Sequence, residues 1–503
     1  MRRSSPGTRS SSTEARSRER RRQHWRSRTD VAQNATARGP RMTATDSLRL
    51  LTAQAEVWVA HEVDSESPQF NSGGYLELSG PLRRDLLDRA VERVDVECEA
   101  LRVHPDLART DVSGAPAAGI AEAAGSGVEF VDLTGAASVP DGKDAARSAM
   151  AADLDRPLRL GIDALVRMTL FRLAPEHHLF YLRIHHILLD GYGQVLYWRR
   201  LARVYSALVT GNEPPPSSFG RLRELSGEER RYVGSADFAR DRSYWLDRMA
   251  DPPARMDLGG TPEPGRRVLR TAGDVAIAMR ELHLAAAVLD VHWSVLGIAA
   301  LATYLHRLTG QDDVVLGFPV RARTTRLALT TPAMLANELP LRLSVPAAAT
   351  TAELVLQTNQ AIAQALRHQR YRGEEVHRVL RARYGHVEHP AVVANLVSFD
   401  IALTFGDCTA SVCQLSTGPV RDLSMDFFGG TQDGPLRLGL SSSGTAIGRS
   451  DLDAHRVRFG EFLAVFLAAP GSSPLMSLEL LGGDERAGTG PRAPAPSAAS
   501  PEE

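Results

Sequence analysis

Two runs of alternating apolar and polar residues, at 165–173 and 179–185, predict a β-hairpin. Proline and polar residues in the segment 174–177 supply the turn between them. Because side chains alternate across a strand, the second run sorts its residues onto two faces: Phe180, Leu182, Ile184 and His186 on one, and Tyr181, Arg183 and His185 on the other. His186 is therefore expected at the strand's end, in line with apolar neighbours.

Other patterns predict a mixture of helices and strands over the rest of the chain. Helical periodicity predicts helices at residues 82–94, 194–208 and 293–308. Shorter β-prone runs predict strands at 314–317, 339–343 and 392–403. The elements alternate irregularly and no internal repeat is visible, which indicates a mixed α/β fold, an α+β sandwich.

Length and breaker residues divide the chain into four segments. A chain of 503 residues exceeds one ordinary core, and the Gly- and Pro-rich stretch at 211–220 marks a boundary between two lobes. We expect a disordered Arg/Ser-rich extension at 1–45, an N-terminal lobe at 46–215, a C-terminal lobe at 216–485 and a disordered tail at 486–503. We interpret the extension as solvated or untranslated, with the true start at Met1 or Met42, rather than as an RNA- or partner-binding arm.

Composition excludes several classes of protein. The net charge is −1 and the pI about 7.0, so no global field attracts nucleic acid or an anionic membrane. No apolar run reaches the roughly 18 residues that span a bilayer, and no signal core follows the basic N-terminus. Cys98, Cys408 and Cys413 are too few for a disulfide framework and lack the spacing of a zinc site. The sequence therefore predicts a reduced, cytoplasmic protein.

The segment from Ile184 to Gly191 carries the clearest chemistry in the sequence. It places His185, His186, Asp190 and Gly191 between a predicted strand and a predicted helix. A neutral imidazole in a partly dry site suits proton transfer near neutral pH. No serine or cysteine lies at a recognisable nucleophile elbow, so a catalytic triad is not predicted. From these residues alone, a catalytic His186 and a satisfied core histidine both remain open.

The same segment resembles the HHxxxDG motif of the condensation domains of nonribosomal peptide synthetases. Further motifs of that family appear in order: AQxxxW at 51–58, RHExLR at 97–102, GxPVxxR at 317–323, NxxPLR at 337–342 and an HQ-containing motif at 367–371. The resemblance covers about residues 47–485, and residues 395–400 and 418–423 most resemble the catecholate siderophore subgroup, such as enterobactin synthase. Glu97 and Cys98 depart from the second motif, where the family has arginine and histidine.

The resemblance implies a fold and a reaction. It implies two lobes like chloramphenicol acetyltransferase, forming a V with a central tunnel. It also implies attack of an amine, with an alcohol as the alternative, on an acyl thioester carried by phosphopantetheine. Alignment of two reactants can itself lower a barrier by roughly 7–11 kcal/mol. His186 would then accept a proton from the zwitterionic adduct rather than deprotonate the resting ammonium.

The resemblance also assigns supporting roles. It pairs Asp190 with an arginine, for which we expect Arg323, with Arg102 as the alternative, while His185 is expected to support the site by packing or hydrogen bonding. Gly191 would permit a tight exit into the following helix and turn its amide toward the thioester oxygen. Asn395 either lines the tunnel and orients the acceptor or is an ordinary strand amide.

Partners and alternatives follow from the same resemblance. We expect no bound cofactor or metal, a 4′-phosphopantetheine arm delivered by a carrier protein in trans, an adenylation enzyme acting indirectly, a small-molecule amine acceptor and a monomer. Leu481-Gly482-Gly483-Asp484 imitates a carrier motif, but Glu485 stands where its serine would be. Two alternatives remain: an acyltransferase of the same fold that uses acyl-coenzyme A, and a non-catalytic docking platform in a biosynthetic assembly line.

Overall fold

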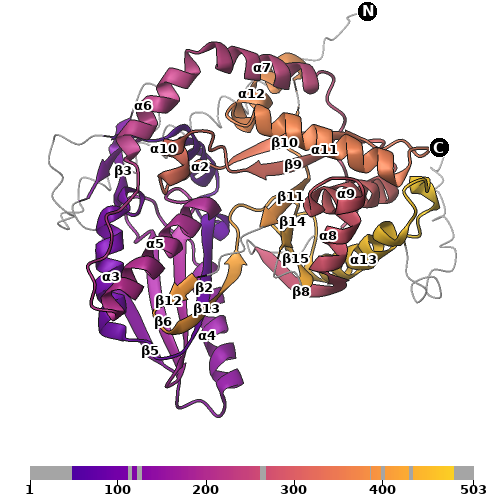
Figure 1. The fold of residues 1–503 in the computed structure, drawn as a ribbon. Coiled ribbons are helices and arrows are strands. Elements are labelled where there is room, and N and C mark those ends of the chain that lie inside the picture. The colour runs from indigo at the N-terminus through magenta and orange to yellow at the C-terminus, as the bar shows by residue number, and fades with distance from the viewer. Residues whose placement is uncertain are drawn as a thin grey trace, which may run out of the picture.

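Two six-stranded β-sheets organise the part of the chain that the structure describes, one in each of two lobes that open into a V (Figure 1). The structure is a computed structural model that describes residues 48–110, 116–121, 127–260, 268–385, 387–397, 403–429 and 434–480. The expected extension, the tail and the carrier-like segment 481–485 lie outside these residues. The two-lobed mixed α/β fold expected from the sequence is confirmed.

The strands form three sheets with the orders β12-β13-β2-β7-β6-β5, β10-β9-β11-β14-β15-β8 and β1-β4-β3. Their bounds are β1 Leu48–Arg49, β2 Asn71–Ser79, β3 Val103–Thr110, β4 Pro116–Ile120, β5 Val128–Asp132, β6 Val166–Ala174, β7 His177–His185, β8 Leu269–Ala278, β9 Asp313–Val320, β10 Asn337–Ser344, β11 Val392–Val397, β12 Leu403–Phe405, β13 Cys408–Ser416, β14 Leu423–Phe428 and β15 Pro435–Ser442. Most pairs are antiparallel, while β5–β6, β9–β11 and β11–β14 are parallel.

Helices cover the sheets and bridge the lobes. Their bounds are α2 Thr52–Val63, α3 Arg84–Glu97, α4 Val139–Leu154, α5 Gly191–Val209, α6 Leu222–Val233, α7 Ala236–Arg248, α8 Met279–Val288, α9 Trp293–Thr309, α10 Arg326–Thr330, α11 Thr351–Arg367, α12 Gly373–Tyr384 and α13 Arg449–Ala468. Helices α6 and α7 run from the first lobe to the second across the closed side of the V (Figure 1).

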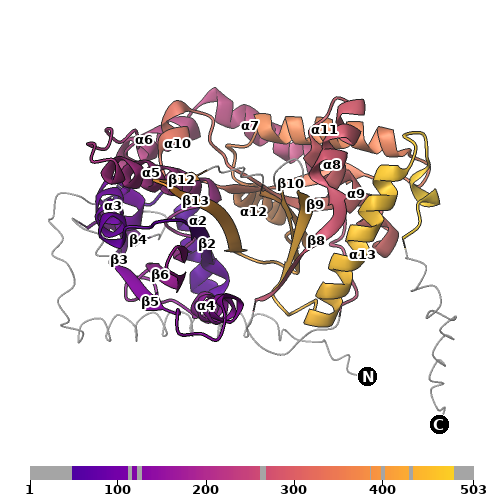
Figure 2. The same cartoon turned by 60° about the horizontal axis from the view of Figure 1, so that its bottom comes forward.

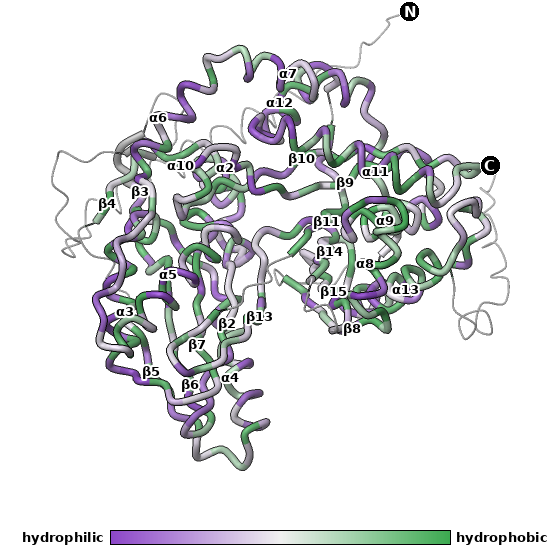
Figure 3. The backbone as a smooth tube through the Cα atoms, in the orientation of Figure 1, coloured by the Kyte–Doolittle hydropathy of each residue, from purple (hydrophilic) through white to green (hydrophobic). Residues whose placement is uncertain are grey.

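The local predictions agree well with these bounds. The hairpin is β6 and β7, and the predicted helices are α3, α5 and α9. The run at 392–403 begins as β11, which ends at Val397, and β12 starts at Leu403. Helix α9 is apolar on every face because it lies within the core of the second lobe, and Figure 3 shows it as largely hydrophobic. Gly310 ends it in the left-handed conformation, with φ of 71°.

An exchange of strands joins the two lobes. After β11 the chain leaves the second sheet, forms β12 and β13, and returns as β14. Strand β13 pairs antiparallel with β2, so it lies in the sheet of the first lobe (Figure 2). Phe405 and Cys408 are accordingly buried in the core of the first lobe. The expected division at residue 215 assigned this segment to the second lobe, and the β2–β13 pairing corrects that assignment.

No single helix among the described residues is long and apolar enough to cross a membrane. Helices α8 and α9 meet the length and composition criteria only as a pair, which is bent by 89°.

Candidate active site

The two motif histidines lie where β7 ends and turns toward α5. Alternation holds along the strand, since Phe180, Leu182 and Ile184 face the large core of the first lobe, whereas Tyr181 faces a smaller cluster. The pleat stops at His185, the last residue of β7. The His185 ring packs against Phe70, a member of the large core, with ring centroids 5.9 Å apart. The prediction that His185 points away from this core is therefore wrong, because the turn interrupts the alternation.

His185 is fixed by its surroundings. It is 1% exposed, its Nδ1 accepts a hydrogen bond from the Ile187 amide at 3.2 Å, and its ring meets His61 edge-on at 5.1 Å. Burial, followed by the nearby His61 and His186, lowers its pKa well below the usual value. A neutral, packed imidazole of this kind can hold the turn in place.

His186 lies between the first lobe and the returning strand segment. It is 6% exposed, and its backbone amide donates to the carbonyl of Phe70 at 2.7 Å. Gly418, between β13 and β14, lies against the ring edge: a Cβ at this glycine would stand 2.2 Å from His186 Cδ2 and 2.6 Å from Nε2. Gly418 also has φ of 112°, which favours glycine. The exchange of strands thus forms one wall of the site, while the predicted tunnel stays a prediction.

The electrostatics of His186 favour a neutral ring. Burial lowers its pKa, and the Asp190 carboxylate together with backbone groups of Thr417 and Leu189 offsets only part of that effect. Its Nδ1 is buried without a hydrogen-bond partner among the described residues. A buried polar atom normally has a partner, so Nδ1 is available to a water or a ligand, as is Nε2 of His185. The ring can therefore act as a proton acceptor at neutral pH.

Asp190 and Arg323 form a buried ion pair that ties the motif to the second lobe. Arg323 Nη1 and Nη2 donate to the Asp190 carboxylate at 2.6 and 3.0 Å, and the two side chains are 2% exposed or less. The amides of Gly193, Leu335 and Ala336 donate to the same carboxylate at 2.8–2.9 Å. Burial raises the pKa of Asp190, but Arg323 and these amides outweigh burial and hold it below its usual value. The carboxylate is an anchor and the N-cap of α5.

Two of the expected supporting residues have other surroundings. Arg102 donates to the carbonyls of Ala121 at 2.6 Å and Val96 at 3.0 Å, which corrects its alternative assignment as the partner of Asp190. Gly191 is the first residue of α5 and does not have a positive φ. A left-handed backbone is therefore not the reason for a glycine here, and the expectation that Gly191 permits a tight exit stays a prediction.

Asn395 belongs to a polar cluster that the sequence did not reveal. Its Nδ2 donates to Asp426 Oδ1 at 2.8 Å across the parallel pair β11–β14. Thr417 Oγ1 lies 3.3–3.4 Å from both oxygens of the same carboxylate. Burial raises the pKa of Asp426 to about 6, although Asn395, Thr417 and Arg270 act in the opposite direction. Thr417 is adjacent to Gly418, so this cluster reaches the wall beside His186.

The sequence did not show that Gly418 and Asp426 lie beside the candidate site, for an identifiable reason. Gly418 was visible only as part of a motif, and its contact with His186 depends on strands that are distant in the chain. Asp426 lies in the buried strand Leu423–Phe428, which is apolar apart from Ser424, and a lone acid in a buried strand is the signal that could have found it.

The departures in the second family motif have structural roles. Glu97 accepts hydrogen bonds from Arg200 of α5 at 2.6 and 2.7 Å, so it braces the helix that follows the histidines. Cys98 is fully buried and burial raises its pKa to about 12, as expected for a small core residue. Neither residue lies at the histidine turn.

Comparison with known proteins assigns the family. A family model described as "Condensation domain" matches residues 44–416. The chain belongs to this family. Its reaction class is amide-bond-forming acyl transfer in nonribosomal peptide synthesis. The first condensation domain of the calcium-dependent antibiotic synthetase, solved with a substrate analogue, is 30% identical with a TM-score of 0.78 and covers 88% of this chain and 100% of that one.

Longer curated proteins contain similar condensation domains. The isonitrile lipopeptide synthase of Streptomyces coeruleorubidus is 35% identical over 428 residues, covering 85% of this chain and 29% of that protein. The dimodular nonribosomal peptide synthase of Bacillus subtilis is 34% identical over 440 residues, covering 87% and 18%. Enterobactin synthase component F of Escherichia coli is 28% identical over 431 residues, covering 84% and 32%. The chain therefore spans less than a third of the length of these relatives.

Proposed function

We propose that this condensation domain joins an acyl or aminoacyl thioester, carried by the phosphopantetheine of a carrier protein, to an amine, and that His186 takes the proton. The carrying observation is His186 itself, a buried imidazole with a lowered pKa and an Nδ1 that lacks a partner among the described residues, set where the two lobes meet. The carrier, an adenylation enzyme that loads it, and the acceptor belong to this proposal.

The reaction balances without a covalent enzyme intermediate. The amine nitrogen attacks the thioester carbonyl carbon, and the adduct gives one N–H proton to His186. Collapse of the adduct forms the amide and breaks the carbon–sulfur bond. The thiolate then takes the proton from His186 and leaves as a thiol. The neutral ring suits the first proton transfer, and such a group contributes roughly 10²–10⁴-fold to a rate.

Asp190, Arg323 and His185 position this group in our proposal. The Asp190–Arg323 pair holds the turn against the second lobe, and His185 packs beneath it. Asn395 is proposed to orient the acceptor amine. Its Nδ2 already donates to Asp426, so its Oδ1 is the atom that would accept a hydrogen bond from the amine N–H. Gly191 is proposed to turn its amide toward the thioester oxygen.

A single experiment tests the role of His186. The purified protein is given one acyl group on a carrier protein together with candidate amines, and amide is measured by mass spectrometry. We expect His186→Ala to lower the rate roughly 10²–10⁴-fold. His177→Ala is the matched control, because His177 belongs to the other histidine pair and bonds Glu77 at 2.8 Å, far from the turn. Equal rates for wild type and His186→Ala would overturn the proposal.

A second candidate function is direct use of acyl-coenzyme A. It is favoured by a mutant of the similar starter condensation domain of rhizomide synthetase, solved in complex with C8-CoA, which is 30% identical with a TM-score of 0.78. Offering the same acyl group on the carrier and on coenzyme A separates the two. Turnover with the carrier alone supports the first function, equal turnover supports the second, and no turnover with either supports a docking platform.

The donor class is a finer proposal. Relatives include both a lipopeptide synthase and enterobactin synthase component F. The likeness of residues 395–400 and 418–423 to the siderophore subgroup leads us to propose an aryl or aminoacyl donor in secondary metabolite biosynthesis. A panel of aryl, aminoacyl and fatty acyl carriers tests this, and preference for the fatty acyl carrier would overturn it.

A further inference from the structure

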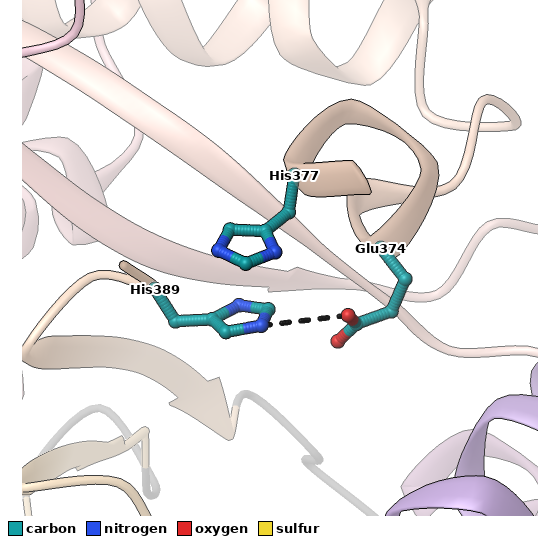
Figure 4. A group of neighbouring side chains, drawn as sticks. All are labelled: Glu374, His377 and His389. Carbon is teal, nitrogen blue, oxygen red and sulfur yellow. Dashed lines mark ion pairs between the residues drawn. The ribbon is translucent and has the colours of Figure 1, made fainter. Parts of the chain in front are cut away.

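A second group of chemically active side chains lies in the other lobe, away from the histidine turn. Glu374 and His377 are three residues apart on α12, so they share one face of the helix. His389 comes from the segment that leads into β11. One potential ligand atom from each of the three lies within 4.8 Å of those of the others. Figure 4 shows the Glu374 carboxylate directed toward the adjacent edges of both imidazole rings.

The two imidazoles lie face to face, and a backbone carbonyl orients one of them. The His377 and His389 rings stack with centroids 3.8 Å apart and an angle of 16° between their planes. His377 Nε2 lies 2.6 Å from the carbonyl of Val387, so Nε2 carries the hydrogen and Nδ1 carries the lone pair in the neutral ring. A backbone carbonyl that orients a histidine in this way is typical of metal ligands. His389 Nε2 lies 3.5 Å from the Glu374 carboxylate.

Acidic and basic side chains surround the group. Two guanidinium groups, Arg255 and Arg421, form ion pairs with four carboxylates: Glu338, Glu374, Glu388 and Asp422. Arg421 is 2.9 Å from Glu338 but 3.7 Å from Glu374, so Glu374 is the more weakly held of these two. Its side chain is 47% exposed and can move. Arg372 also acts on Glu374 and Arg381 on His389, so a cation would have to bind through its ligands rather than through an excess of negative charge.

We propose that Glu374, His377 and His389 form a binding site for a divalent cation of the zinc class. Two imidazole nitrogens and one carboxylate oxygen are a ligand set that zinc prefers. Imidazole lone pairs lie in the ring plane, so the two stacked rings turn toward the shared ion on binding. The same residues line a cavity of about 440 Å³, which gives water access to the fourth position. The cation links α12 to the segment preceding β11, the strand that carries Asn395.

Metal binding by the full chain tests this site independently of condensation activity. Chelator-treated protein is titrated with Zn²⁺ against a chromophoric competitor, and Co²⁺ is added separately to record its visible absorption. We expect one site per chain, with the Co²⁺ band of a four-coordinate centre. Loss of even an outer-sphere partner costs roughly 10–100-fold in metal affinity, so Glu374→Gln and His389→Ala should each cost at least about 100-fold.

Two matched variants make the result specific. Glu375→Gln changes the neighbouring acid on α12, which bonds Arg378 instead, and should bind Zn²⁺ like the wild type. His186→Ala removes one histidine of the other buried pair, His185 and His186, and should also bind Zn²⁺ like the wild type. Circular dichroism establishes that each variant is folded. Stoichiometric Zn²⁺ binding that survives both Glu374→Gln and His389→Ala, or that is lost in His186→Ala, would overturn the proposal, as would wild-type protein that binds no Zn²⁺.

Discussion

Two buried aspartates lie near His186, and their partners differ in charge. Asp190 is 1% exposed and receives both Nη atoms of Arg323. Asp426 is 4% exposed, and its hydrogen bonds come from the neutral side chains of Asn395 and Thr417. The pKa of Asp190 is held below its usual value, whereas that of Asp426 is raised to about 6. Burial acts on both carboxylates alike, so the charged partner decides which one is fixed as an anion.

Removing the first carboxylate should produce the largest effect on stability. Asp190→Ala leaves the Arg323 guanidinium buried without its counter-charge, and breaking such a pair costs about 3–5 kcal/mol. We expect loss of soluble protein or a strong shift of the urea denaturation midpoint. The double variant Asp190→Ala with Arg323→Met is the control and should be less destabilised than the single variant. An Asp190→Ala protein with an unchanged midpoint that merely turns over slowly would contradict this.

Removing the charge of the second carboxylate, Asp426, should raise stability rather than lower it, and the gain should depend on pH. The folded pKa of Asp426 is raised, so between about pH 4 and pH 6 the folded state keeps a proton that the unfolded chain releases, and stability falls as pH rises. Asp426→Asn removes this penalty. We expect it to stabilise the fold by up to about 3 kcal/mol at pH 8 and by little at pH 4.

Thermal unfolding across this pH range measures the Asp426 effect. Asp190→Asn provides the contrast, because the folded pKa of Asp190 is depressed and its contribution is present above the unfolded pKa and lost as pH falls. A stability difference between wild type and Asp426→Asn that does not change between pH 4 and pH 8 would show that Asp426 is ionised normally.

Overpacking the wall beside His186 should have an intermediate effect on stability. In Gly418→Ala the new methyl group would stand 2.2 Å from His186 Cδ2, and the residue would keep φ of 112°. Overpacking of this kind costs about 1–3 kcal/mol. We expect lower stability together with displacement of the ring, seen as a lower kcat. Gly471→Ala, whose Cβ would meet Ala352 Cβ at 3.2 Å in an exposed turn, is the control. Normal kcat and stability in Gly418→Ala would contradict the contact.

The sequence predicted what depends on neighbours in the chain. The hairpin β6–β7 and the helices α5 and α9 follow from period-two and period-3.6 patterns that act over a few residues. The Asp190–Arg323 contact came from the resemblance to a family rather than from periodicity. The wall beside His186 could not be predicted, because it needs β13 to pair with β2, more than 300 residues away.

Strand ends and buried acids mark the other limits of prediction. Alternation placed His185 on the wrong face, since a period-two pattern does not show at which residue the strand ends. No strand was predicted around Asp426, and its partners Asn395 and Thr417 come from separate elements. Both residues are aspartates, so only their tertiary surroundings distinguish Asp190 from Asp426.

The smallest expected effect concerns Asn395, which separates an ordinary strand amide from an acceptor-orienting residue. Asn395→Ala removes one neutral hydrogen bond to Asp426, worth about 0.5–1.5 kcal/mol of stability. It also removes an interaction that lowers the pKa of Asp426, so the pH window of the Asp426 effect should move upward.

If Asn395 is an ordinary strand amide, only these changes are expected. If Asn395 orients the acceptor, the variant should also have a higher KM for the amine and an unchanged KM for the carrier-bound donor. Each KM is measured by varying that substrate alone. Thr417→Val is the matched control, because it also removes a neutral partner of Asp426 but leaves the Asn395 oxygen in place. An equal rise of the amine KM in both variants would assign the effect to Asp426 and leave Asn395 as a strand amide.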